Sequence, residues 1–173
     1  MRAHCVPALT AGLLVLGLFG CAPKPVGLPK LQVVPFVDQP VPDAPACVRP
    51  AEMAAFNMAA TKVRLYVLAR NCGMIDQYNA FVTKYRTQFP PHERALSGYF
   101  ARTTKRGAVA AKDEYDTGLA NALSQRYAYD VASACAAAPS DFALATAAKT
   151  TAELNQAAET LAISQPIKLA ACQ

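Results

Sequence analysis

Apolar side chains recur in steps of three and four residues along most of the chain after residue 50. Such steps line one face of an α-helix, so the pattern predicts amphipathic helices that bury that face. Alanine, the strongest helix former, is abundant, whereas the 173 residues include only 8 glycines. We therefore predict an all-α domain over residues 51–173. The clearest apolar run consists of Ile75, Tyr78, Val82, Tyr85 and Phe89.

Two helices are expected before residue 107. The first covers residues 51–70, because Pro50 suits a helix start and Asn71-Cys72-Gly73 suits a helix end. The second covers residues 76–106, with a break or kink at Pro90-Pro91, where proline removes a backbone donor.

Two further helices are expected after Gly107. The third covers residues 108–137 and is ended by Pro139. The fourth starts with Ser140 as its N-cap, with Asp141 behind it, and stops before Pro166. Four amphipathic segments with short connections predict an up-down antiparallel four-helix bundle.

The first 20 residues have the features of an export signal. Arg2 gives a basic start, and the apolar run over residues 6–19 is too short to span a bilayer. Leu18-Phe19-Gly20-Cys21 resembles the lipobox of bacterial lipoproteins, which are cut before the cysteine and lipidated on it. We expect residues 1–20 to be removed and Cys21 to anchor the chain to membrane lipid. An ordinary secretory signal cut nearby would instead leave Cys21 as a free thiol.

Residues 21–50 are expected to form an extended tether, because eight prolines lie between positions 22 and 50. The stretch over residues 31–37 is unlike a spacer, since a free linker would expose its apolar side chains at a cost. It is expected to pack either on its own domain or on a partner subunit, and the sequence leaves both open. The candidate contact residues of this stretch are Leu31, Val33, Val34 and Phe36.

Four cysteines remain after Cys21, an even number that predicts two disulfides in an oxidising compartment. Cys47 and Cys72 flank a helix about 30 Å long, so they cannot pair with each other. The up-down order brings Cys72 to Cys135 and Cys47 to Cys172. If the break at Pro90-Pro91 reverses the chain, Cys47–Cys135 and Cys72–Cys172 are the alternative.

Basic residues are concentrated between Lys62 and Arg126, where there are eleven of them against five acidic residues. The turn expected between the second and third helices is small, polar and basic. It suits docking against an acidic partner surface, although an ordinary solvated helix end has the same composition. Export makes nucleic acid an unsuitable partner. The candidate contact residues of this turn are Arg102, Thr104, Lys105 and Arg106.

No pattern for catalysis follows the signal. His92 is the only histidine after Cys21, and beside Pro91 it is expected to be an exposed residue at a helix start. The acidic cluster Asp113, Glu114 and Asp116 falls early in a helix, where carboxylates favour the helix dipole. Neither metal-ligand spacing nor a phosphate loop nor a c-type haem motif is present. The chain is therefore predicted not to be an enzyme and to carry no cofactor.

Several stretches after the tether resemble small exported helical proteins of alphaproteobacteria. They are Cys72-Gly73, Tyr78-Asn79-Ala80-Phe81 and Tyr115-Asp116-Thr117-Gly118-Leu119-Ala120-Asn121. Within that group the chain is similar to the small accessory subunit, subunit III, of the membrane-bound quinohaemoprotein alcohol dehydrogenase of acetic-acid bacteria. The resemblance implies a subunit without cofactor that assists assembly and membrane attachment of larger envelope subunits, whose own cofactors are PQQ and haem c.

We expect a non-catalytic, lipid-anchored accessory subunit of an envelope complex, on the periplasmic side of the cell membrane. The sequence leaves open which membrane holds the protein. The resemblance implies the inner membrane, whereas Ala22, which is not the aspartate of lipoproteins retained there, favours the outer membrane. The alternative is a helical lipoprotein of the cell envelope that binds a small ligand or lipid.

Overall fold

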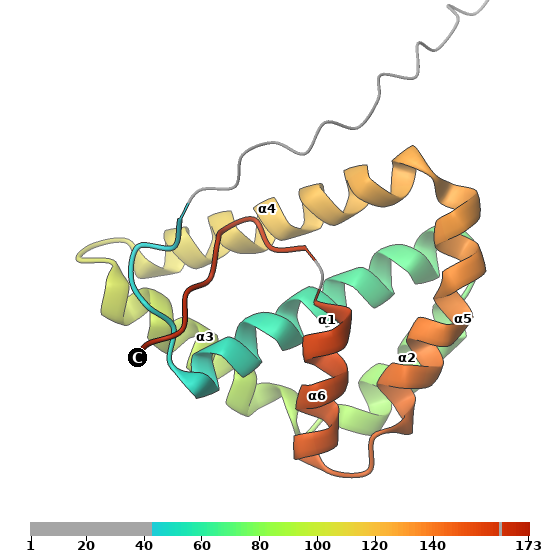
Figure 1. Ribbon diagram of the computed structural model, residues 1–173, viewed down its shortest axis with the longest axis horizontal. Coiled ribbons are helices and arrows are strands. Elements are labelled where there is room, and N and C mark those ends of the chain that lie inside the picture. Colours follow the sequence, from blue (N-terminus) through green and yellow to red (C-terminus); the bar gives the residue numbers. More distant parts are fainter. Residues whose placement is uncertain (1–42, 163) are drawn as a thin grey trace, which may run out of the picture. The chain divides into compact units, whose positions relative to one another are not determined.

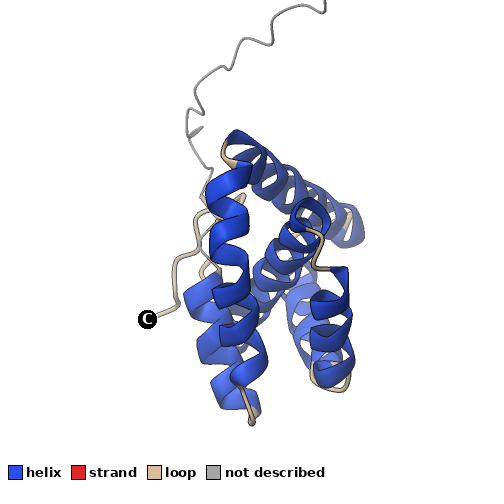
Figure 2. Cartoon of the chain, turned by 90° about the vertical axis from the view of Figure 1, so that its right-hand side faces the viewer, coloured by secondary structure: helices blue, strands red, loops and turns tan. Residues whose placement is uncertain are grey.

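The computed structural model describes residues 43–162 and 164–173. The signal segment, Cys21 and the apolar stretch at residues 31–37 lie outside the described residues. Within the described residues the chain forms six α-helices and, apart from two isolated β-bridges, no strand (Figure 2). The all-α prediction is confirmed for this part of the chain. The helices are α1 (Pro50–Cys72), α2 (Ile75–Tyr85), α3 (Phe89–Thr103), α4 (Ala108–Tyr129), α5 (Val131–Ala147) and α6 (Thr151–Leu161).

The first helix is the centre of the fold, because α1 contacts each of the other five helices (Figure 1). Phe56 and Leu65 lie half a helical turn out of phase, yet both are completely buried. A helix that is apolar on several sides is stable only when neighbours cover it on those sides. This arrangement of six helices, five of them around α1, differs from the predicted four-helix up-down bundle.

The break between the predicted halves of the second helix is present, but it lies before the prolines. Helix α2 ends at Tyr85, and α3 begins at Phe89, so that Pro90 and Pro91 occupy the first turn of α3. The first N–H groups of a helix have no partner within it, which makes this turn the place where proline costs least.

The predicted third helix is wrong at its C-terminal end. It breaks at Asp130, whose side chain accepts a hydrogen bond from the backbone N–H of Ser133 and so caps α5. Pro139 lies inside α5 instead of ending a helix. The pattern missed this because the apolar spacing continues through residue 130, while a local capping bond interrupts the backbone.

The predicted N-cap at Ser140 is also wrong. Ser140 lies within α5, and its hydroxyl donates to the carbonyl of Ala137. The N-cap of the last helix, α6, is instead Thr150, whose side chain accepts from the backbone N–H of Glu153. Asp141, expected in a first turn, is buried in the middle of α5.

The structure contains the disulfides Cys47–Cys172 and Cys72–Cys135, with Cα–Cα distances of 4.9 and 5.4 Å. These are the two pairs that the helix order led us to expect, and not the alternative set. The first bond joins the segments that precede α1 and follow α6. The second ties the C-terminal end of α1 to α5.

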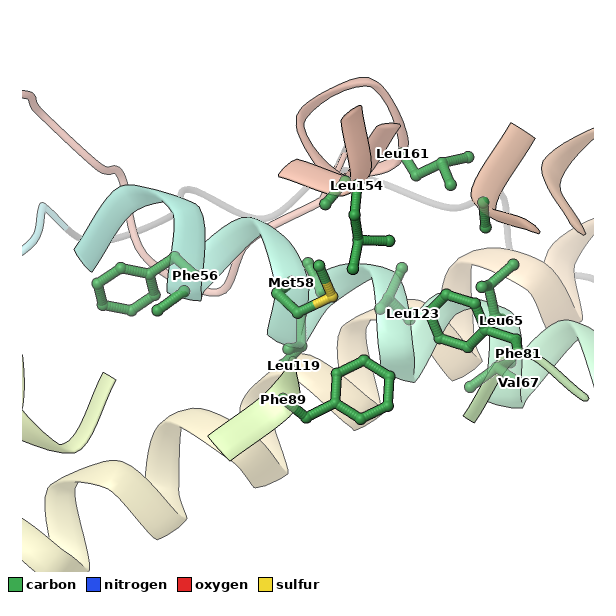
Figure 3. Close-up of a cluster of buried hydrophobic side chains, with 14 of the residues drawn as sticks. Phe56, Met58, Leu65, Val67, Phe81, Phe89, Leu119, Leu123, Leu154 and Leu161 are labelled. Carbon is green, nitrogen blue, oxygen red and sulfur yellow. The ribbon is translucent and has the colours of Figure 1, made fainter. Parts of the chain in front are cut away.

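The core is aromatic around the N-terminal half of α1. The ring of Phe56 meets Tyr99, Phe100 and Tyr115 edge-on, with centroid separations of 4.9, 6.1 and 5.1 Å. Leucines from α4 and α6 continue this core along α1 (Figure 3). Gly118 on α4 gives room to the segment after α6, since a Cβ at this position would stand 3.3 Å from the Cβ of Pro166.

Candidate functional site

The first and last described segments of the chain pair with each other. We call this pairing, of residues 43–48 with residues 168–172, the terminal ribbon. The N–H of Ala44 donates to the carbonyl of Lys168 at 2.9 Å, and that of Val48 to Ala170 at 2.8 Å. The Cys47–Cys172 disulfide closes the same pairing covalently. Residues 43–48, the last part of the predicted tether, are therefore held to the C-terminal segment instead of forming a free spacer (Figure 1).

Helix α3 fastens this ribbon to the domain. The hydroxyl of Tyr99 donates to the carbonyl of Ala46 at 3.1 Å, and Arg102 Nη2 donates to that of Cys47 at 2.9 Å. The same guanidinium forms a bidentate pair with Glu52, at 2.6 Å to Oε2 and 3.1 Å to Oε1. Arg102, expected to contact a partner, is thus engaged within its own chain.

Glu52 is the buried half of this pair, only 7% exposed. Burial opposes ionisation of its carboxyl group. The hydrogen bonds from Arg102 and from the backbone N–H of Arg49, with the charges of both residues, outweigh burial, so that the pKa of Glu52 lies below its ordinary value. The carboxylate of Glu52 therefore serves to hold the ribbon.

The basic turn between α3 and α4, which we call the basic tip, consists of residues 104–107. Gly107 closes it with a φ of 78°, a left-handed conformation that suits glycine. Lys105 and Arg106 are exposed and form no ion pair within the described residues, whereas Thr104 is half-buried. Of the four candidate contact residues in this basic stretch, Lys105 and Arg106 are the two that are available to a partner.

Lys112, one turn further on, is already paired. Its ammonium group lies 2.6 Å from Asp116 and 3.7 Å from Glu93, and Glu93 also lies 2.8 Å from Lys62. Burial opposes ionisation of Glu93, but the two lysines outweigh it and lower the pKa of its carboxyl group. This network joins α1, α3 and α4 and uses one member of the acidic cluster. Asp113, of the same cluster, is exposed.

His92 is not the exposed residue that the sequence predicts, since it is 9% exposed. Its Nδ1 lies 2.8 Å from the carbonyl oxygen of Gln88, and its Nε2 lies 2.8 Å from Oδ1 of Asn155 on α6. Packing of α6 against this side of the domain covers the ring. Both ring nitrogens have partners that fix the imidazole, so the contacts of His92 join α3 to α6.

The sequence did not reveal the buried ion pair that joins α1 to α5. Arg64 donates to Oδ2 of Asp141 through Nε at 2.9 Å and Nη2 at 2.6 Å, and through Nη1 to the carbonyl of Leu161 at 3.1 Å. Both charged residues are only 9% exposed. A charged residue inside the apolar stretch of α1 is a signal that a buried partner exists, but its spacing does not identify that partner.

Three hollows of the described domain are grooves between its elements. The α2–α5 groove has a volume of about 540 Å³, and the α5–α6 groove about 330 Å³. A third, of about 570 Å³, lies between α1, α6 and the end of the terminal ribbon. No group of three or more metal-ligating side chains occurs within the described residues. None of the described helices is both long enough and apolar enough to cross a membrane.

Comparisons with known proteins add no family to this picture. A scan against protein-family models, a search of curated proteins and a search of solved structures found no match to this chain.

Proposed function

We propose that the protein is a non-catalytic, lipid-anchored accessory subunit that helps to hold a larger envelope complex together. The observation that carries this proposal is the basic tip, whose Lys105 and Arg106 are exposed while the charged residues beside them pair within the chain. An exposed pair of cations at a turn suits docking against an acidic protein surface.

The attachment of the tether supports the same proposal. The terminal ribbon is held by backbone bonds, by the Cys47–Cys172 disulfide and by Tyr99 and Arg102 of α3. Helix α3 also leads directly into the basic tip. One helix therefore joins the terminal ribbon, where the tether is attached, to the basic tip. Such a connection suits a subunit that links a membrane anchor to a partner.

The resemblance to subunit III of quinohaemoprotein alcohol dehydrogenase supplies a candidate partner class. The partner would be a periplasmic dehydrogenase with its cytochrome, and PQQ and haem c would belong to those subunits.

The test is purification of the full chain from native membranes in mild detergent, with mass spectrometry and a visible absorption spectrum. Co-purifying dehydrogenase and cytochrome chains with haem bands would support the proposal, and lipid on Cys21 would support the anchor. A lone, colourless, lipidated monomer would overturn the proposal and favour a lipoprotein that binds a small ligand.

The role of the basic tip is tested by the double variant Lys105→Glu with Arg106→Glu. We expect about tenfold less partner to co-purify, because like charges opposed at an interface are strongly unfavourable. The matched control is Arg86→Glu with Arg94→Glu, which changes the same amount of charge at two exposed positions on the α2–α3 side. Equal retention of the partner by both double variants would exclude the basic tip as the contact.

A further inference from the structure

The basic tip is a short exposed turn with two adjacent cations at its centre. Lys105 and Arg106 are exposed and form no ion pair within the described residues. Exposed loop tips made of small and polar residues are the places where folded proteins are nicked by proteases. A peptidase that cleaves after lysine or arginine finds its preferred side chain twice in this turn.

The backbone on both sides of the two cations suits a peptidase, which binds its substrate in extended form. Thr104 before them is already extended, with φ −114° and ψ 117°. The first turn of α4 after them contains no acidic side chain, and its N-cap, Gly107, forms no side-chain hydrogen bond. A capping bond stabilises a helix by about 1 kcal/mol. Without it the turn that contains Val109, 76% exposed, opens locally at low cost.

The turn between α2 and α3 carries the exposed Arg86 but is fixed on both sides. Tyr85 before it is 2% exposed, and its hydroxyl donates to the carbonyl of Ala148 at 2.9 Å. Phe89 after it is buried, and the N–H of Gln88 donates to the carbonyl of Tyr85 at 2.8 Å. Opening this turn exposes buried aromatic rings to water, which costs free energy, so its arginine is a poor target for a peptidase.

Two exposed lysines outside the helices are held by their backbone bonds. The N–H of Lys149, between α5 and α6, donates to the carboxylate of Glu153 at 2.7 Å. The carbonyl of Lys168, in the terminal ribbon, accepts from the N–H of Ala44 at 2.9 Å. A peptidase must break these bonds before it can bind either segment, whereas the two cations of the basic tip stand free of such pairing.

We propose that the basic tip is a processing site, at which an endopeptidase specific for basic residues cuts the folded chain. The peptide bond after Lys105 or after Arg106 is hydrolysed. Its C–N bond breaks, the carbonyl carbon takes the hydroxyl group of a water molecule, and the nitrogen of the next residue takes the proton. A cut after Arg106 leaves both cations on the first chain and adds a carboxylate beside them, so it changes the charge of the basic tip.

The product is one molecule of two chains, because both disulfides cross the point of cleavage. Cys47–Cys172 and Cys72–Cys135 each join a residue before the basic tip to a residue after it. Packing crosses it as well, since α1 before the cut contacts α4, α5 and α6 after it. The nick therefore opens a single turn and leaves the helices and their core in place.

The test is limited digestion of the full chain in mild detergent with a small amount of trypsin, which cleaves after lysine and arginine. Within the described residues we expect the first cut to follow Lys105 or Arg106, at least about tenfold faster than any other, because cleavage follows the population of the opened segment. Cut sites are identified by mass spectrometry. Lys105→Gln with Arg106→Gln should remove this cut, whereas the control Arg86→Gln should leave it unchanged.

The product should keep the size of the intact chain on a gel without reductant and split in two with reductant, while its far-UV circular dichroism stays the same. A first cut after Arg86, Lys149 or Lys168, or fragments that separate without reductant, would overturn the proposal.

The chain isolated from native membranes gives the physiological result. Two bands with reductant, with the new ends at the basic tip, would support processing, and a single band under both conditions would overturn it. These measurements are made on this chain alone, so this inference and the proposed function fail separately.

Discussion

Removing the carboxylate of Asp141 should be among the most damaging single changes in this domain. Asp141→Ala takes away the acceptor of two hydrogen bonds, from Nε and Nη2 of Arg64, and leaves that guanidinium 9% exposed without its counter-charge. Breaking a buried pair by deleting one partner costs about 3–5 kcal/mol. A domain of this size has a total stability of about 5–15 kcal/mol, so the loss is a large fraction of it.

The assay is urea and thermal unfolding at pH 7, followed by far-UV circular dichroism with both disulfides intact. We expect Asp141→Ala to lower Tm by about 10–20 °C. Arg64→Met combined with Asp141→Leu should restore most of the loss, since an apolar pair of similar volume replaces a buried ion pair at little cost. The double variant separates the penalty of an unpaired charge from the contribution of the pair.

The neighbouring residue provides the control. Ser140→Ala should change stability by less than about 0.5 kcal/mol, because Ser140 is exposed within α5. If Ser140 were the N-cap that the sequence predicts, its loss would cost about 1 kcal/mol. A small effect of Asp141→Ala, below about 1 kcal/mol, or a large effect of Ser140→Ala would refute this account of α5.

Two further predictions concern single side chains. The folded pKa of Glu52 lies below its unfolded value of 4.5, so its pair with Arg102 adds stability above that pH and loses it as pH falls through the folded pKa. Glu52→Gln should therefore be less stable than wild type at pH 7 and should lose less stability on acidification, measured as Tm from pH 7 to 3; parallel curves for the two proteins would contradict this. The buried hydroxyl of Tyr127 has no hydrogen-bond partner in the described structure. Tyr127→Phe should therefore leave the free energy of unfolding unchanged or raise it by up to about 1 kcal/mol. A clear loss of stability in urea unfolding would contradict this prediction.

Much of the helical content could be predicted from local features. The three-and-four spacing from Ile75 to Tyr85 identified α2, and Pro50 and Gly73 marked the ends of α1, because caps and amphipathic spacing act over a few residues. The disulfide pairs followed from helix order, even though that order contains six helices instead of four. Helix α4 runs beside α1 in the same direction, which is enough to bring Cys135, just after α4, near Cys72 at the end of α1 (Figure 1).

The candidate site could be predicted only in part. Lys105 and Arg106 were expected at an exposed turn, and both are exposed. Arg102 belonged to the same basic stretch, but it pairs with Glu52, 50 residues away. A run of cations indicates a basic surface, yet it does not show which of its members find a partner inside the chain.

The sequence by itself determined that the described domain is helical, where α1, α2 and α4 begin, and that Cys47 and Cys72 do not bond to each other. These properties depend on spacing, capping and composition along short stretches. Only the tertiary structure decided that α1 is central, that Asp130 interrupts a helix while Pro139 does not, and that His92 and Asp141 are buried. The physical reason is that burial and the pairing of charges depend on neighbours far away in the chain, such as Asn155 for His92 and Arg64 for Asp141.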